Sequence, residues 1–132
     1  MITVTSLNAN GLRTASRRQQ TWMVSDSDII CVQETHWDEA SVRECMREWN
    51  GDVYANNGKG KSRGVAILVK RGLLEKVRVS MNDGEGRVIG IQFELLGGKM
   101  QLLNVYAAND DRERKLFFEK LGGMCDGRCI IV

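Results

Sequence analysis

The first part of the chain alternates between apolar runs with strand character and segments with helical spacing. Residues 2–8 alternate with β-branched side chains and predict a strand, whereas residues 14–25 predict a helix. Residues 28–33 predict a second strand. Residues 38–49 begin with acidic residues and place apolar ones near helical spacing, which predicts a second helix. The order strand, helix, strand, helix is typical of an α/β protein.

Beyond this point the strand-like runs follow one another with no helical pattern between them. Gly97 and Gly98 predict a two-residue hairpin loop between the last two runs, so we expect this part to be antiparallel. A charged amphipathic segment at 110–123 predicts another helix, and residues 128–132 predict the start of a buried strand. The strand-like runs are residues 52–55, 64–70, 76–80, 87–96 and 99–107.

These elements predict one layered α/β domain with helices on one face of a sheet. The length of 132 residues fits a single domain, and 42% hydrophobic residues are enough for an ordinary core. The sequence contains no internal repeat, low-complexity tract or linker. A plain α+β domain without a functional site is the structural alternative.

The charge balance excludes a protein that holds nucleic acid through bulk positive charge. Nineteen Lys and Arg face 17 Asp and Glu, so the net charge is only +2. Two local basic clusters remain candidates for phosphate contact. The cluster around Lys59 is explained equally well as an ordinary solvated hairpin loop. These clusters are Arg13, Arg17 and Arg18, and Lys59, Lys61 and Arg63.

The apolar runs are too short for a membrane span, which needs about 18 consecutive apolar residues. The first charge of the chain also follows its first apolar stretch, the reverse of a secretory signal. We therefore expect an intracellular protein without a membrane partner. The spacing of Cys31, Cys45, Cys125 and Cys129 suits neither a metal site nor two disulfides, so we expect reduced, mostly buried thiols.

Polar side chains stand at the ends of three strand-like runs. Glu34 follows the apolar run 29–32, Asn8 ends the first strand, and Tyr106 and then Asn109 follow the run 101–105. Ligand sites of α/β sheets commonly lie at such strand ends, and an ionised carboxylate needs a partner there. Taken singly, each has a structural reading as well: a turn residue for Asn8, a surface or capping acid for Glu34, and an edge aromatic for Tyr106.

Four motifs in this order, "LNANGL", "CVQETH", "GVAILV" and "LLNVYAAND", resemble the endonuclease/exonuclease/phosphatase superfamily. The resemblance covers essentially all of residues 1–132 and is strongest to the apurinic-type endonuclease domain of non-LTR retrotransposons. It implies a partial domain: half of a four-layer α/β sandwich, truncated, with a mixed, mostly antiparallel sheet and flanking helices.

The same resemblance implies a divalent-metal-dependent phosphodiesterase that nicks DNA. By this resemblance, Glu34 binds Mg²⁺ or Mn²⁺ with Asn8 beside it, and Tyr106 and Asn109 contact the scissile phosphate. Mg²⁺ prefers oxygen ligands and is often held by only one or two carboxylates. The partner is then DNA, bound through its phosphodiester backbone, and the place of action of a retroelement endonuclease is the nucleus.

The family site also uses an Asp and an Asn in a Gly-Asp-x-Asn segment, and an Asp-His pair, which have no counterpart in this sequence. We therefore expect the chain to be inactive alone and to pair with the missing C-terminal half. His36 follows Glu34 too closely to replace the family's general base, and Ala108 replaces a proline of relatives. We also expect self-association through an exposed inner sheet face made of Val65, Ile67, Ile89, Ile91, Leu103 and Val105.

Two other functions stay open at this stage. The chain could be a non-catalytic remnant or interaction module of the same fold, because half of the expected site is absent. It could also belong to a branch of the superfamily that acts on another phosphoester, such as a phosphoinositide.

Overall fold

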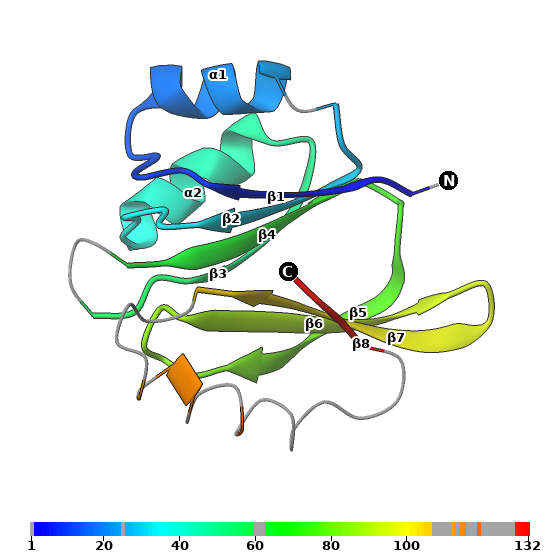
Figure 1. The fold of residues 1–132 in the computed structure, drawn as a ribbon. Helices are drawn as coiled ribbons and strands as arrows, with labels where there is room; N and C mark the ends of the chain where they lie inside the picture. Colours follow the sequence, from blue (N-terminus) through cyan, green and yellow to red (C-terminus); the bar gives the residue numbers. More distant parts are fainter. Residues whose placement is uncertain are drawn as a thin grey trace.

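The computed structural model describes residues 2–24, 26–59, 63–106, 112, 114–115, 119 and 129–132. Within them the chain forms two four-stranded sheets, each built from one continuous half of the sequence (Figure 1). The first half contains β1 (Val4–Asn8), α1 (Ala15–Val24), β2 (Ile29–Gln33), α2 (Glu39–Glu48), β3 (Gly51–Asn56) and β4 (Val65–Lys70). The second half contains β5 (Glu75–Asn82), β6 (Val88–Leu95), β7 (Gly98–Val105) and β8 (Cys129–Ile131).

The first sheet has the strand order β1-β2-β4-β3, with a parallel β1–β2 pair and antiparallel pairs elsewhere. Helices α1 and α2 cover its outer face (Figure 1). Asp38 caps α2 because its carboxylate accepts a hydrogen bond from Ser41 N at 2.8 Å, which also lowers the pKa of Asp38. The core between helices and sheet consists of Leu12, Ile30, Val32, Trp37, Cys45, Val53, Ala66 and Leu68.

The second sheet has the order β5-β6-β7-β8, with antiparallel pairs up to β7 and a parallel β7–β8 pair. The β6–β7 hairpin turns at Leu96 and Gly97, which have φ values of 51° and 78°, while Leu95 pairs with Gly98. The hairpin loop therefore lies one residue earlier in the sequence than the predicted Gly97-Gly98 loop. A two-residue hairpin loop with positive φ at both positions matches strand twist, and here a leucine takes the first of them.

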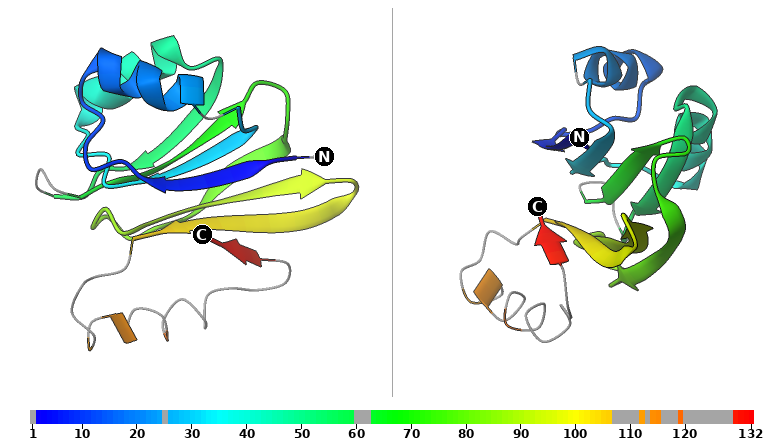
Figure 2. Two further views of the ribbon diagram at one scale, coloured as in Figure 1. Left: turned by 45° about the horizontal axis from the view of Figure 1, so that its top comes forward. Right: turned by 90° about the vertical axis from the view of Figure 1, so that its right-hand side faces the viewer.

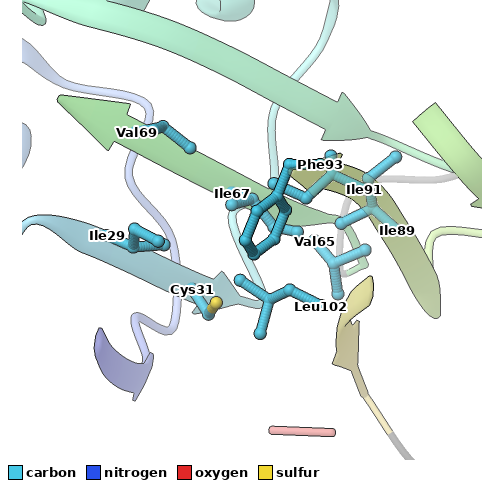
Figure 3. Packing of buried hydrophobic residues seen from close by; sticks show 9 residues of the cluster. All are labelled: Ile29, Cys31, Val65, Ile67, Val69, Ile89, Ile91, Phe93 and Leu102. Carbon is cyan, nitrogen blue, oxygen red and sulfur yellow. The ribbon is translucent and has the colours of Figure 1, made fainter. Parts of the chain in front are cut away.

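The two sheets pack face to face through apolar side chains, giving three layers: helices, first sheet, second sheet (Figure 2). Strand β2 is buried on both faces, since Ile29 and Cys31 face the second sheet while Ile30 and Val32 face the helices. This double burial explains its unbroken apolar run. Figure 3 shows the core between the sheets, formed by Ile29, Cys31, Val65, Ile67, Val69, Ile89, Ile91, Phe93 and Leu102.

The predicted exposed inner sheet face is wrong. Val65 and Ile67 of the first sheet are fully buried against Ile89 and Ile91 of the second. The sequence runs 64–70 and 87–96 look alike, and nothing in their patterns shows that they belong to different sheets. Leu103 is also buried, but in a cluster that includes Val88 rather than between the sheets.

The predicted α/β class, with mixed, mostly antiparallel pairing and flanking helices, is confirmed. Most of the predicted helix at 110–123 lies outside the described residues, although Arg112, Arg114, Lys115 and Glu119 are helical. No helix in the described part of the chain is long and apolar enough to cross a membrane.

The cysteine prediction is confirmed for two residues and wrong for a third. Cys31 and Cys45 are free and buried, and burial raises the pKa of each thiol to about 12. Cys129, in contrast, is disulfide-bonded. Cys125 lies outside the described residues.

Candidate functional site

The pairing of β1, β2 and β4 continues past the strand ends into the loops that carry the predicted site. Gly11 N donates to Glu34 O at 2.7 Å, and Thr35 N donates to Gly64 O at 3.1 Å. Asn8 is in register with Gln33, the residue that precedes Glu34. The backbone of Asn8 and that of Glu34 therefore lie close together at the carboxyl ends of two parallel strands.

Glu34 and Tyr106 meet although they lie 72 residues apart and follow strands of different sheets. The Tyr106 hydroxyl donates a hydrogen bond to Glu34 Oε1 at 3.0 Å. Both residues are half-buried, and Tyr106 N donates to Arg87 O at 2.7 Å. The hydrogen bond to the Glu34 carboxylate raises the pKa of Tyr106 and keeps the phenol protonated.

The backbone around Glu34 is held in an unfavourable conformation. Asn10, Glu34 and His36 have φ values of 48°, 54° and 57°, which place these non-glycine residues in the left-handed region. Such strain costs about 1–3 kcal/mol per residue and persists only where neighbouring contacts impose it. Here Glu34 O accepts a hydrogen bond from Gly11 N, and His36 N donates one to Arg63 O. Local strain of this kind is concentrated at functional sites in proteins.

The donor groups at this point suit a hard divalent cation. Glu34 Oε1 accepts from Tyr106, and within the described residues Glu34 Oε2 accepts no hydrogen bond. The exposed amide of Asn8 offers a second oxygen, which already accepts from Asn10 N at 3.1 Å. One carboxylate and an amide oxygen fit Mg²⁺ or Mn²⁺, which retain several waters. The described residues contain no group of three or more His, Cys, Asp or Glu side chains that could hold a metal.

The other candidates are distributed unevenly around Glu34. His36 donates through its backbone N to Arg63 O at 3.0 Å and accepts from Arg13 Nε through its backbone oxygen. Its ring lies against Gly11, where an added Cβ would stand 3.0 Å from His36 Nδ1. Asn109 lies outside the described residues, as do Ala108 and Lys61.

Arg18 does not belong to a DNA-facing surface, contrary to the sequence-based expectation for the Arg13, Arg17 and Arg18 cluster. Its guanidinium is fully buried and donates to both Glu48 oxygens at 2.8 Å and to Glu44 at 3.0 Å. It also donates to Leu12 O at 3.1 Å. Arg18 therefore ties α2 to the loop that follows β1.

Sequence reasoning missed two polar residues behind the site, Gln33 and Asn104. Gln33 is 8% exposed and Asn104 is fully buried, and Gln33 Nε2 donates to Asn104 Oδ1 at 2.6 Å. The signal was present, because asparagine is depleted in strands and occurs here inside the apolar run "LLNVY". A buried amide in such a run needs specific partners.

Comparison with known proteins gives the chain its family. The model of the endonuclease/exonuclease/phosphatase family matches residues 5–131. The Xenopus laevis "Transposon TX1 uncharacterized 149 kDa protein" is 28% identical over 123 residues, which are 91% of this chain and 9% of that protein. The Bacillus subtilis exodeoxyribonuclease is 34% identical over 115 residues, 81% of this chain and 43% of that protein.

Solved structures share the fold. The catalytic domain of Xenopus laevis APE2 has a TM-score of 0.67 at 21% identity, over 93% of this chain and 51% of that one. Truncated Caenorhabditis elegans TDP2 has a TM-score of 0.59 at 21% identity, over 92% of this chain and 52% of that one. The 3′ phosphatase NExo from Neisseria, bound to a product DNA hairpin, has a TM-score of 0.54 at 22% identity, over 91% of this chain and 48% of that one.

The chain spans half or less of the length of the curated relatives and about half of the solved structures. The family match nevertheless covers residues 5–131. Within this range, the ends of two strands of the chain bring Glu34 and Tyr106 together. The chain belongs to the endonuclease/exonuclease/phosphatase family.

Proposed function

We propose that residues 1–132 are the N-terminal part of a divalent-metal-dependent phosphodiesterase that nicks DNA. The hydrogen bond of 3.0 Å between Tyr106 and Glu34 carries this proposal. It joins a carboxylate and a neutral donor from two sheets at one edge of the molecule. A carboxylate that can hold a cation, next to a donor that can orient a phosphate oxygen, suits metal-assisted phosphodiester cleavage.

Glu34 and Asn8 are the residues that would hold Mg²⁺ or Mn²⁺, with water completing its coordination. When bound, the cation would neutralise charge that develops on the phosphate. Tyr106 has a single O–H, which donates to Glu34 Oε1 in this structure. With that carboxylate turned to the cation, the hydroxyl would donate to a phosphate oxygen instead. Asn109 is proposed as a second donor to the same phosphate.

DNA is the proposed substrate, and a mobile element is the proposed origin. The Bacillus relative is named an exodeoxyribonuclease, the Neisseria structure contains a DNA hairpin, and the Xenopus relative is a transposon protein. These three names favour DNA over other phosphoesters as the substrate. A retroelement endonuclease would nick its target in the nucleus.

The partner we propose is the remaining part of the family domain, packed against the open edges of both sheets. In the described residues β1 pairs only with β2, and β8 pairs only with β7. Between these edges lies an apolar groove of about 470 Å³, and Val4 and Ile130 on its walls are 39% and 41% exposed. The groove is lined by Ile2, Val4, Ile29, Phe93, Leu102 and Ile130, among others. Because the solved relatives are about twice as long, their additional chain is the favoured occupant.

The metal assignment is tested by Mn²⁺ binding to the chain itself, measured by electron paramagnetic resonance. Glu34→Gln should abolish binding while leaving the circular dichroism spectrum unchanged. Glu75→Gln is the matched control, because Glu75 is an exposed glutamate on edge strand β5. In a complete domain containing these residues, Glu34→Gln should also abolish Mg²⁺-dependent nicking of plasmid DNA. Retained nicking would reject the role of Glu34.

The partner assignment is tested by analytical ultracentrifugation of the chain with and without a separately expressed C-terminal part of the domain. A one-to-one complex that is weakened by Val4→Glu supports the proposal. A homodimer weakened by the same substitution would assign the groove to a second copy instead. Met46→Glu is the control, because Met46 is 53% exposed on α2, away from the groove.

A further inference from the structure

Behind the Glu34–Tyr106 pair, a hydrogen-bonded cluster of buried amides connects the two sheets. Asn104 of β7 donates through Nδ2 to Val32 O at 2.9 Å and to Ala66 O at 2.7 Å, on two strands of the first sheet. Its Oδ1 accepts from Gln33 Nε2 at 2.6 Å. The same Gln33 nitrogen lies 3.1 Å from Ser6 Oγ on β1. The Asn104 side chain thus contacts β2 and β4 at once.

This cluster differs in kind from most of the contact between the sheets, where a second amide link runs from Asn56 Nδ2 of β3 to Val88 O of β6 at 2.7 Å. The core around it is made of aliphatic, aromatic and thiol side chains, whose packing fixes distance but has little directional preference. Both amide hydrogens of Asn104 and its oxygen have partners, so rotating or shifting the side chain would leave a buried polar atom unpaired. Together with Asn56, the cluster therefore adds directional contacts that fix how one sheet is registered on the other.

The cluster lies next to the site along the sequence of both β2 and β7. Gln33 directly precedes Glu34, and Asn104 of β7 lies two residues before Tyr106, which directly follows that strand. Glu34 follows the first sheet and Tyr106 follows the second. Their hydrogen bond consequently depends on how the two sheets are aligned at this end.

We propose that Asn104 and Gln33 are positioning residues that hold Glu34 and Tyr106 in register across the two sheets. The proposal rests on the proposed function, for which it names the groups that align the site. Neither residue touches the metal or the phosphate. Their role is to prevent the strand ends from sliding apart, as outer hydrogen-bond partners of metal ligands commonly do.

The test substitutes Asn104→Leu, which keeps the number and branching of the side-chain heavy atoms and removes every hydrogen bond of the amide. The first measurement needs no metal: the ¹³C shift of the Tyr106 ring carbon Cζ at neutral pH, assigned with Tyr106→Phe. In Asn104→Leu this signal should move to its position in Glu34→Gln, where the carboxylate acceptor is absent. The second measurement is the Mn²⁺ dissociation constant, which should rise about tenfold or more.

Gln101→Leu is the matched control. Gln101 is also a buried amide of β7, 8% exposed, but it bonds Ser80 Oγ at 2.8 Å within the second sheet. It should lower stability against urea without changing the Tyr106 signal or the Mn²⁺ affinity. An Asn104→Leu protein that keeps the parent Tyr106 signal while losing stability would overturn the proposal.

A second variant guards against failure of Asn104→Leu to fold. Gln33→Met removes only the Gln33 link and leaves the bonds of Asn104 to Val32 and Ala66 in place. It should shift the Tyr106 signal part of the way, and an unchanged signal would overturn the role of Gln33. If the parent chain fails to bind Mn²⁺, the metal function is rejected, while the Tyr106 signal still decides the positioning role.

Discussion

Gly64 lies so close to Thr35 that a Cβ atom on residue 64 would stand 2.3 Å from Thr35 Oγ1. Thr35 is fully buried and directly follows Glu34, and its backbone N donates to Gly64 O at 3.1 Å. Gly64 also has a φ of 120°, which side chains other than hydrogen rarely allow. The close contact holds the start of β4 against the loop that carries the candidate metal ligand.

Gly64→Ala should therefore lower the free energy of unfolding by about 1–3 kcal/mol and weaken Mn²⁺ binding by displacing the loop. Urea unfolding and Mn²⁺ titration measure the two effects. Gly72→Ala is the control, since Gly72 has a φ of 73° but nothing lies within 4 Å of its added Cβ. An equal loss in both variants would show that the contact with Thr35 contributes nothing.

Arg18 should be among the most sensitive positions outside the site. Arg18→Met removes one of the two side-chain donors to Leu12 O, the other being Trp37 Nε1 at 2.8 Å. It also removes the link from α1 to Glu44 and Glu48. Breaking a buried ion pair typically costs about 3–5 kcal/mol, and partial exposure of both glutamates reduces the expected loss to about 2–3 kcal/mol. Thermal and urea unfolding measure it. Arg43→Met, at an exposed position of α2, should change stability by less than about 0.5 kcal/mol.

The capping carboxylate of Asp38 should make stability depend on acidity. Its hydrogen bonds from Ser41 lower its pKa in the folded state from the ordinary value of 3.8. A lowered carboxyl pKa stabilises the fold above the ordinary value, and this stabilisation is lost as the pH falls through the folded value. Asp38→Asn keeps a capping oxygen and should unfold with a weaker dependence on pH below about 4.

Urea midpoints at neutral pH and at acid pH measure this difference. Asp52→Asn serves as the control, because in the described part of the chain the exposed Asp52 caps no helix and its side chain accepts no hydrogen bond. A pH dependence that survives Asp38→Asn unchanged would contradict the role of the cap.

The two free thiols should resist alkylation in the folded protein. Burial raises the pKa of Cys31 and Cys45 to about 12, so that almost no thiolate exists near neutral pH. Iodoacetamide labelling followed by peptide mass spectrometry should modify both residues only in denaturant. Fast labelling of Cys31 in native buffer would show that the sheets separate readily, because Cys31 lies in the core between them.

The elements and their order followed from the sequence because each strand has a clear apolar period or run. The double burial of β2 appears as the unbroken run 29–32, and the polar residue that ends it marks the site. The assignment of strands to sheets did not follow. Ile67 and Ile89 occur in similar apolar runs, yet they belong to different sheets and pack against each other in the core.

The sequence pointed to the site residues Glu34 and Tyr106, but not to Asn104, which lies behind them. Glu34 and Tyr106 stand out because polar side chains break an apolar run, and the structure brings them together. Asn104 lies inside such a run, and its partners Val32 O and Ala66 O are backbone atoms of two other strands. Every residue has a backbone carbonyl, so the residue type does not show which carbonyl accepts a hydrogen bond. Hydrogen bonds from Asn104 to the backbone of other strands therefore cannot be recognised from the sequence pattern.

Each sheet is built from one uninterrupted stretch of sequence, and a single short turn, residues 71–74, connects them. All strand ladders of the described residues therefore close within their own stretch, and the two stretches are joined by side-chain contacts and by a backbone hydrogen bond from Gly64 N to Gly86 O at 3.3 Å. Cleavage of the polypeptide in this turn would break no ladder. The two resulting fragments carry complementary apolar faces and a matching amide cluster, which makes this protein suited to reconstitution from separately produced pieces.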